Sequence, residues 1–263
     1  MLTRGLLSRW IEAFQNDPKA LFISLAIEVP AFLMALILHE ISHGYMALWC
    51  GDGTARMMGR LSLRPSHHLD PVGSLCMVMF GFGWAKPVPV NPRNFRHYVR
   101  DDFLVSIAGI TMNLCLFLVS SILLAVVTSV NLKFPSYAER FLSCNYSGFY
   151  YIYTYTGDAS VSMFFRYEWM LYIQHFLAYF SLLNLALAVF NFLPVPPLDG
   201  FHIFNDILLR GKLRLNTQTF WICQVALLGL CYSTNIIGKV LSAAESAVQG
   251  GLMSGLVKLF GLG

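Results

Sequence analysis

Long apolar runs dominate the chain, and its polar residues gather in the intervals between them. A helix needs about 20 mostly apolar residues to cross the roughly 30 Å of hydrocarbon in a bilayer. Three runs meet this length, at residues 20–49, 103–130 and 170–193, and a weaker fourth covers about residues 220–240. The apolar run 72–84 is too short to cross and contains glycines, so it predicts a re-entrant or hairpin segment.

The composition agrees with a protein whose main solvent is lipid. Of 263 residues, 56% are hydrophobic and 12% are charged, against about 25% charged residues in soluble domains. We therefore predict an all-α polytopic membrane protein, a bundle of about four to six transmembrane helices. Its parts are an amphipathic N-terminal segment (1–19), a transmembrane core (20–240) and a C-terminal tail (241–263). A frayed leader is an equally good interpretation of the first segment.

Basic residues in the intervals indicate the orientation of the chain. Seven lie between positions 51 and 102 and three follow the third run, namely Arg56, Arg60, Arg64, Lys86, Arg93, Arg96, Arg100, Arg210, Lys212 and Arg214. Because cytoplasmic loops are enriched in Lys and Arg, both intervals are predicted to face the cytoplasm. The net charge of +4 is modest, and the six cysteines form no CxxC pair. Nucleic-acid binding and a disulfide framework are therefore both disfavoured.

The first run contains the sequence HEISH at residues 39–43, which is an HExxH motif. Positions four apart lie on one face of a helix, so His39 and His43 are predicted to ligate one ion while Glu40 polarises a water molecule. Ionisable side chains inside a span cost about 2.5–3.5 kcal/mol each, and binding a dication offsets that cost. The alternative is a polar helix face that packs inside the bundle without a metal.

Two histidines leave a catalytic zinc site one protein ligand short. Asp199 follows the third run within the sequence NFLPVPPLDG (191–200), whose prolines must end the helix. We expect Asp199 to lie on irregular backbone at the membrane boundary and to supply the third ligand. Its alternative role is to cap a helix that begins at Phe201.

Taken together, these stretches resemble the site-2 protease family of intramembrane metalloproteases, in particular its compact bacterial members. The resemblance covers roughly residues 20–211 and rests on HEISH, Gly109 to Asn113 (a GxxxN pattern), NFLPVPPLDG, LDPVG (69–73) and GWAKPVPVNPRN (83–94). It implies proteolysis of transmembrane substrate helices near the cytoplasmic face, with Asp199 as third ligand and Asn113 near the substrate. It also implies single-pass membrane proteins as substrates and a multi-pass location in a bacterial cell membrane.

The expected mechanism uses one Zn²⁺ per chain, held by His39, His43 and Asp199, which lowers the pKa of its water towards 7. Glu40 acts as the base. Asn113 either stabilises the oxyanion or forms an interhelical hydrogen bond. The alternative function is a membrane metal-binding protein, a transporter or a non-catalytic scaffold, that uses the same ligands. The sequence predicts no oligomeric state.

Other polar residues near these motifs are interpreted as structural. His67, His68 and Asp70 form a cluster in a polar loop, and His202 is an isolated histidine at a helix start. Glu28 is the other ionisable residue within the first run. A transporter would need more such residues along a path across the bilayer.

Overall fold

The computed structural model describes residues 14–73, 86–133 and 165–213, together with a few isolated positions after 215. Within these residues the chain is helical, and its one β-type contact is an isolated bridge between Leu132 and Phe165. Three helices are long and apolar enough to cross a membrane, namely α2 (Pro18–Trp49), α6 (Tyr98–Asn131) and α10 (Trp169–Asn191). The chain is therefore an all-α polytopic membrane protein, as its hydrophobic pattern predicts.

The three strongest predicted spans are confirmed, each corresponding to one of these helices. The helices α2 and α6 contain 32 and 34 residues, which is about 50 Å at 1.5 Å per residue and more than the bilayer core needs. The weaker run 220–240, the short run 72–84 and the two predicted tails lie mainly outside the described residues.

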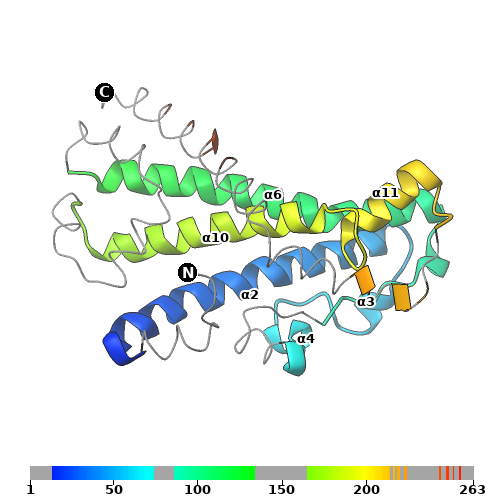
Figure 1. Ribbon diagram of the computed structural model, residues 1–263, viewed down its shortest axis with the longest axis horizontal. Helices are drawn as coiled ribbons and strands as arrows, with labels where there is room; N and C mark the ends of the chain where they lie inside the picture. Colours follow the sequence, from blue (N-terminus) through cyan, green and yellow to red (C-terminus); the bar gives the residue numbers. More distant parts are fainter. Residues whose placement is uncertain are drawn as a thin grey trace.

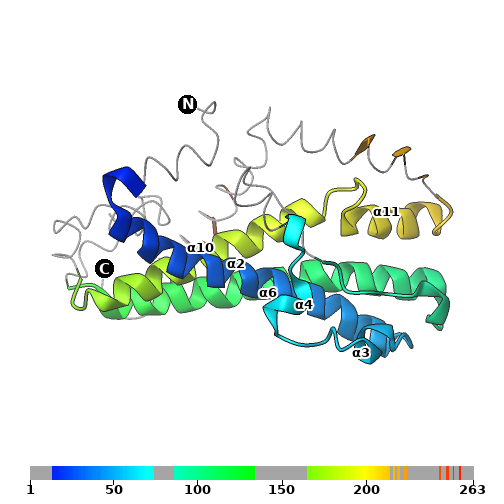
Figure 2. The same ribbon diagram turned by 90° about the horizontal axis from the view of Figure 1, so that it is seen from below.

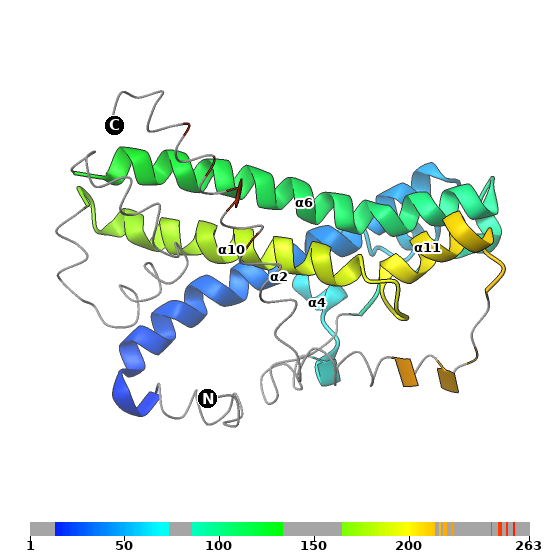
Figure 3. The same cartoon turned by 45° about the horizontal axis from the view of Figure 1, so that its top comes forward.

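The helices α6 and α10 run side by side in opposite directions along the length of the molecule, and α2 packs against both (Figure 1). Ser121 and Ser181 link α6 to α10 through hydroxyls 2.7 Å apart. On α2, Ala31 and Ala35 are fully buried against Phe180 of α10. Small residues of this kind let membrane helices approach closely. Towards its N-terminus, α2 diverges from the other two helices (Figure 3).

A short helix, α11 (Asp199–Leu209), lies beside the N-terminal part of α6 (Figure 2). Its Ile203 packs with Ile110 of α6 and Ala188 of α10, which fixes the position of the helix. The α10 helix ends at Asn191, before the first proline of NFLPVPPLDG, as the sequence predicts.

The backbone expected at Asp199 is wrong, because Asp199 is the first residue of α11 and the irregular segment is 192–198. The cap position belongs to Leu198, which makes no side-chain cap hydrogen bond. The prolines end α10 early enough for a new helix to begin at Asp199. The carboxylate therefore extends from the first turn of a helix that α6 and α10 hold in place.

The loop after α2, which includes α3 (Thr54–Met57) and α4 (Pro65–His68), is tied to the segment before α6 by a buried carboxylate. Asp52 is fully buried and accepts hydrogen bonds from the Asn91 N–H (2.7 Å), the Asn94 Nδ2 (2.8 Å) and the Thr54 N–H (3.1 Å). Burial by itself raises the pKa of Asp52, but these hydrogen bonds outweigh it, and the pKa lies below its ordinary value. The loop is thereby held against the C-terminal end of α2.

Candidate metal centre

Three ligand atoms from two helices converge at the end of the bundle where α11 meets α2 and α6. His39 and His43 lie one turn apart on α2, with their Nε2 atoms 3.0 Å apart. Asp199 places its Oδ2 3.3 Å from the Nε2 of His39 and 3.4 Å from the Nε2 of His43. Both histidines are buried, and Asp199 is half-buried. These residues form the one cluster of metal-ligand type found among the described residues.

The geometry of this cluster fits a zinc ion. A tetrahedral zinc with bonds of about 2.0–2.1 Å separates its ligand atoms by about 3.3 Å, and the three observed separations are 3.0, 3.3 and 3.4 Å. The Asp199 Oδ2 is buried without a hydrogen-bond partner. A buried carboxylate oxygen of this kind is unfavourable by itself, and coordination to a cation satisfies it.

The ring of His43 is oriented by the backbone of α6. Its Nδ1 lies 2.7 Å from the carbonyl oxygen of Val105, which can only accept a hydrogen bond. The Nδ1 must therefore carry the proton, and the Nε2 presents its lone pair to the centre. A hydrogen bond from the second ring nitrogen is typical of metal-ligating histidines.

Gly109 allows α6 to approach both histidines. A Cβ atom at this position would overlap the imidazole rings of His39 and His43. Glycine is the one residue without a Cβ atom, so close approach of the backbone explains its presence here. The glycine of the GxxxN pattern therefore has a steric role that spacing alone does not reveal.

Asn113, the asparagine of that pattern, lies against His39. It is fully buried, and its Nδ2 is 3.1 Å from the Nδ1 of His39. It is not among the described side chains that line the cavity at the centre. Asn113 therefore lies beside the metal cluster, next to the Nδ1 of His39, whereas the Nε2 of the same ring faces Asp199.

Glu40 lies in the wall of a cavity of about 340 Å³ that also exposes His39, His43 and Asp199. Its Oε2 accepts a hydrogen bond of 2.9 Å from the Val88 N–H. Val88 belongs to a segment without helix or strand, residues 86–90, that passes this end of α2. The carboxylate is therefore held at the cavity through one of its two oxygens.

Residues 86–90 are themselves held by Arg60. The Nη2 of this side chain donates to the carbonyl oxygens of Lys86 (2.8 Å) and Pro87 (3.1 Å). The Lys86 N–H donates to the carbonyl oxygen of His68 (2.8 Å). These contacts explain how a segment with few backbone donors keeps its place beside Glu40.

Several further polar side chains of the cavity wall were not assigned a functional role from the sequence, among them Asn191 and His202. Asn191, the last residue of α10, is half-buried there. His202 lines the same cavity, and its Nδ1 lies 3.2 Å from the Oδ2 of Asp102 on α6. The hydrogen bond to Asp102 raises the pKa of His202, although burial opposes it. The position of Asn191 eight residues before Asp199 was a usable signal, because both must lie near the end of α10.

Another acidic side chain, Asp206, lies one helical turn after His202 and is buried. Burial and the charge of Asp102 together raise its pKa to about 6, although the charge of His202 opposes them. The cluster interpreted as structural makes loop contacts: the Nε2 of His68 lies 2.7 Å from the Ser62 carbonyl oxygen, and Asp70 accepts from the Gly73 N–H. Neither side chain lines the described cavity.

Comparison with known proteins gives two matches. The sequence model of peptidase family M50 matches residues 28–231, a range that includes HEISH, Asn113 and Asp199. The chain is also 34% identical over 208 residues to "Putative zinc metalloprotease YwhC" of Bacillus subtilis (strain 168). That alignment covers 79% of this chain and 80% of the relative. No solved structure matches the chain.

Proposed function

The chain belongs to peptidase family M50, and from this premise we propose that it is an intramembrane zinc metalloprotease of the site-2 type. The family and the relative make it a metalloprotease. The finer proposal is carried by one observation: His39, His43 and Asp199 bring three ligand atoms within 3.4 Å of one another beside Glu40.

We assign one zinc ion per chain to His39, His43 and Asp199. Two imidazoles and one carboxylate are a donor set of hydrolytic zinc sites, which keep a fourth position open. When bound, zinc supplies Lewis acidity, which polarises a carbonyl oxygen and lowers the pKa of water to about 7.

Glu40 performs the proton transfers of the proposed reaction. It takes a proton from the attacking water and returns it to the leaving amine. The Val88 N–H holds the carboxylate at the cavity during both steps. General acid–base catalysis of this kind contributes about 10²–10⁴-fold to a rate.

The oxyanion that develops in the reaction needs a hydrogen-bond donor at the cavity wall. Asn191 has an amide there, and His202 has an imidazole that Asp102 orients. Asn113 is fully buried against His39 instead. We therefore assign to Asn191 the oxyanion role that the sequence suggested for Asn113.

The proposed substrates are single-pass membrane proteins cleaved within a transmembrane helix. This proposal is supported by the position of His39 and His43, which lie on a helix long enough to cross the bilayer. A helical substrate has its carbonyl groups hydrogen-bonded, so it must unwind before hydrolysis. Residues 86–90 form neither helix nor strand and lie beside Glu40, so an unwound substrate can run alongside this segment.

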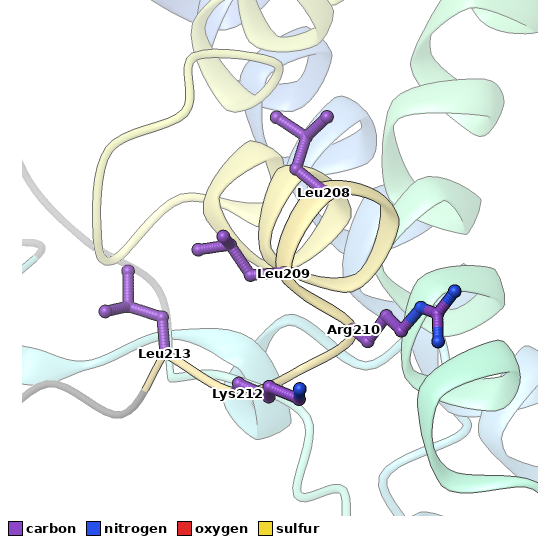
Figure 4. A pocket seen from close by; sticks show the side chains of 5 residues that line it. All are labelled: Leu208, Leu209, Arg210, Lys212 and Leu213. Atoms are coloured by element: carbon purple, nitrogen blue, oxygen red, sulfur yellow. The ribbon is translucent and has the colours of Figure 1, made fainter.

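We place the active site near the cytoplasmic face of a bacterial cell membrane. Basic residues support this orientation, because they are concentrated in the loop between α2 and α6 and in the segment after α11. At the end of α11, Arg210 and Lys212 stand beside the exposed Leu208, Leu209 and Leu213 (Figure 4). Leucine and basic side chains together are typical of a membrane–water interface.

The test compares membranes from cells that express the wild type with membranes from cells that express Glu40→Gln. We expect membrane-protein fragments that appear only with the wild type, whereas the zinc content of the two purified proteins is equal. Zinc-dependent fragments that are equally abundant with both variants would contradict the proposed reaction.

The alternative function, a transporter or scaffold that uses the same ligands, predicts a different result. A transporter moves zinc across the membrane of proteoliposomes, and a scaffold neither moves zinc nor releases fragments. Zinc flux that persists in Glu40→Gln, with no fragments from the wild type, would favour the transporter.

A further inference from the structure

In the side-chain amide of Asn113, the nitrogen has a hydrogen-bond partner and the oxygen has none. Its Nδ2 lies 3.1 Å from the His39 Nδ1, and its Oδ1 is buried without a hydrogen-bond partner. Asn113 itself is fully buried. An unsatisfied buried acceptor destabilises a protein by about 1–3 kcal/mol, so this atom needs an explanation.

The hydrogen bond in this orientation conflicts with zinc binding by His39. An amide NH₂ only donates, so the Nδ1 of His39 must accept, and the ring proton must lie on Nε2. That same Nε2 faces the His43 Nε2 at 3.0 Å and the Asp199 Oδ2 at 3.3 Å. A nitrogen that carries a proton has no lone pair for a metal.

We propose that Asn113 is a positioning residue that orients His39 for zinc through its Oδ1. A half-turn of the amide about its terminal bond exchanges Oδ1 and Nδ2 without moving any other atom. Oδ1 then accepts a hydrogen bond from the His39 Nδ1–H, and Nε2 presents its lone pair to the zinc. The change gives Oδ1 a donor and removes the conflict at His39, and it moves Nδ2 to the position that Oδ1 held.

The neighbouring histidine supports this assignment. His43 donates its Nδ1–H to the Val105 carbonyl oxygen, 2.7 Å away. Val105, Gly109 and Asn113 are spaced four residues apart on α6 and lie on one face of that helix. One face of α6 thus supplies both histidines with an oxygen acceptor and, at Gly109, the space to approach them.

The inference rests on the proposed zinc site, and it differs from a direct catalytic role in the chemistry it requires. A residue that stabilises an oxyanion must donate a hydrogen bond. A residue that orients His39 must accept one. Replacing Asn113 by Asp separates the two roles, because a carboxylate has nearly the same shape and only accepts.

The experiment measures the zinc affinity of the purified full-length protein in nanodiscs by competition with a chelator. We expect Asn113→Leu to weaken zinc binding about 10–100-fold, as the loss of such partners typically does. Asn113→Asp should keep the wild-type affinity within about threefold, because it rescues the acceptor. The visible spectrum of the cobalt-substituted protein should change in Asn113→Leu and be retained in Asn113→Asp.

The matched control is Asn184→Leu. Asn184 is also a fully buried asparagine with an unsatisfied Oδ1, but its Nδ2 donates to the Phe180 carbonyl oxygen within α10. Its replacement should leave zinc affinity unchanged. Equal losses in Asn184→Leu and Asn113→Leu would show a general packing effect and overturn the inference.

Asn113→Asp tests whether position 113 must accept a hydrogen bond, even if Asn113→Leu does not fold. Zinc binding that falls at least tenfold in Asn113→Asp would overturn the inference, because the donor would then be the required group. Failure of the proposed function gives a different result from failure of this inference. If the proposed zinc site is wrong, the wild type should bind zinc no better than His43→Ala, whichever residue occupies position 113.

Discussion

Asp199 and Glu28 are two carboxylates with the same exposure and different surroundings. The side chain of each is 21% exposed, and each faces histidine. Asp199 Oδ2 meets two imidazole nitrogens, at 3.3 and 3.4 Å, in the wall of a cavity. Glu28 Oε1 lies 3.6 Å from a single nitrogen of His175, between α2 and α10.

The difference shows why an ionisable residue in a membrane helix does not by itself indicate a metal site. Glu28 and His175 can satisfy each other as a pair, and the described residues provide no third ligand there. Such pairing is a common way to stabilise charged groups inside the bilayer. At Asp199 three atoms of metal-ligand type converge within 3.4 Å of one another, and this convergence is what favours a cation.

The largest expected effect is on the rate of peptide hydrolysis, which should depend on the region around Asp199 and not on the region around Glu28. Glu40→Gln should lower the rate of peptide hydrolysis about 10²–10⁴-fold, because the base is lost, and it should leave bound zinc unchanged. Glu28→Gln serves as the counterpart and should keep at least half of the wild-type rate. Both are measured with a fluorescent transmembrane peptide in nanodiscs. A similar loss of rate in Glu40→Gln and Glu28→Gln would show that the two regions do not differ in function.

The second effect concerns zinc. Asp199→Asn should reduce zinc affinity by more than about 100-fold, because it removes a direct ligand rather than an outer partner. His175→Asn should bind zinc as the wild type does. Elemental analysis of the purified proteins, followed by chelator titration, measures both. Zinc loss in His175→Asn would show that His175 contributes to the zinc site, contrary to the proposal.

A third effect tests the steric role of Gly109. Gly109→Ala should displace α6 from the two histidines, lower zinc affinity and reduce stability by about 1–3 kcal/mol, as overpacking usually does. Gly53→Ala is the control, because a Cβ there meets no neighbour within 4 Å. Thermal unfolding in detergent, with and without zinc, compares the two. If zinc stabilises Gly109→Ala against thermal unfolding as much as the wild type, α6 can shift to accommodate the extra methyl group, and the steric role of Gly109 is contradicted.

Asp52 adds a third type of buried carboxylate, one satisfied by hydrogen bonds alone. Asp52→Asn should destabilise the protein by about 1–3 kcal/mol at pH 7. Because its folded-state pKa is lowered, Asp52 stabilises the fold above its unfolded pKa of about 3.9. That contribution is lost as the pH falls through the folded-state value. The stability difference between wild type and Asp52→Asn should therefore be full near neutral pH and shrink below pH about 4.

The smallest effect is the coupling of Glu28 with His175. A double-mutant cycle with Glu28→Gln and His175→Asn should give about 0.6 kcal/mol, the average for polar contacts between membrane helices. Thermal unfolding in detergent provides the four stabilities. A coupling of several kcal/mol would mean that this pair, like the cluster at Asp199, is a strongly organised centre.

The sequence predicted those parts of the molecule that depend on local spacing. The span of α2 follows from its apolar length, and the convergence of His39 and His43 follows from the helical repeat. Asp199 was predicted from the chemistry of a zinc site that lacked one ligand. Its placement in the cluster agrees with that prediction.

Other parts of the site depend on how the helices dock, which local spacing does not record. The carbonyl oxygen of Val105 belongs to the backbone and has no sequence signature. His202 looked like polar surface because its partner, Asp102, is 100 positions away. A helix that begins at Phe201 was the alternative considered for Asp199, and the structure begins this helix two residues earlier, at Asp199 itself.

The arrangement of one helix that carries the histidines and another that orients them affects biogenesis. A nascent chain whose α2 has entered the bilayer before α6 has both imidazoles but neither Val105 nor Asn113 beside them. Asp199, later still in the chain, is also absent at that stage. The proposed metal centre therefore cannot be complete before Asp199 has been synthesised and α11 has packed against α6.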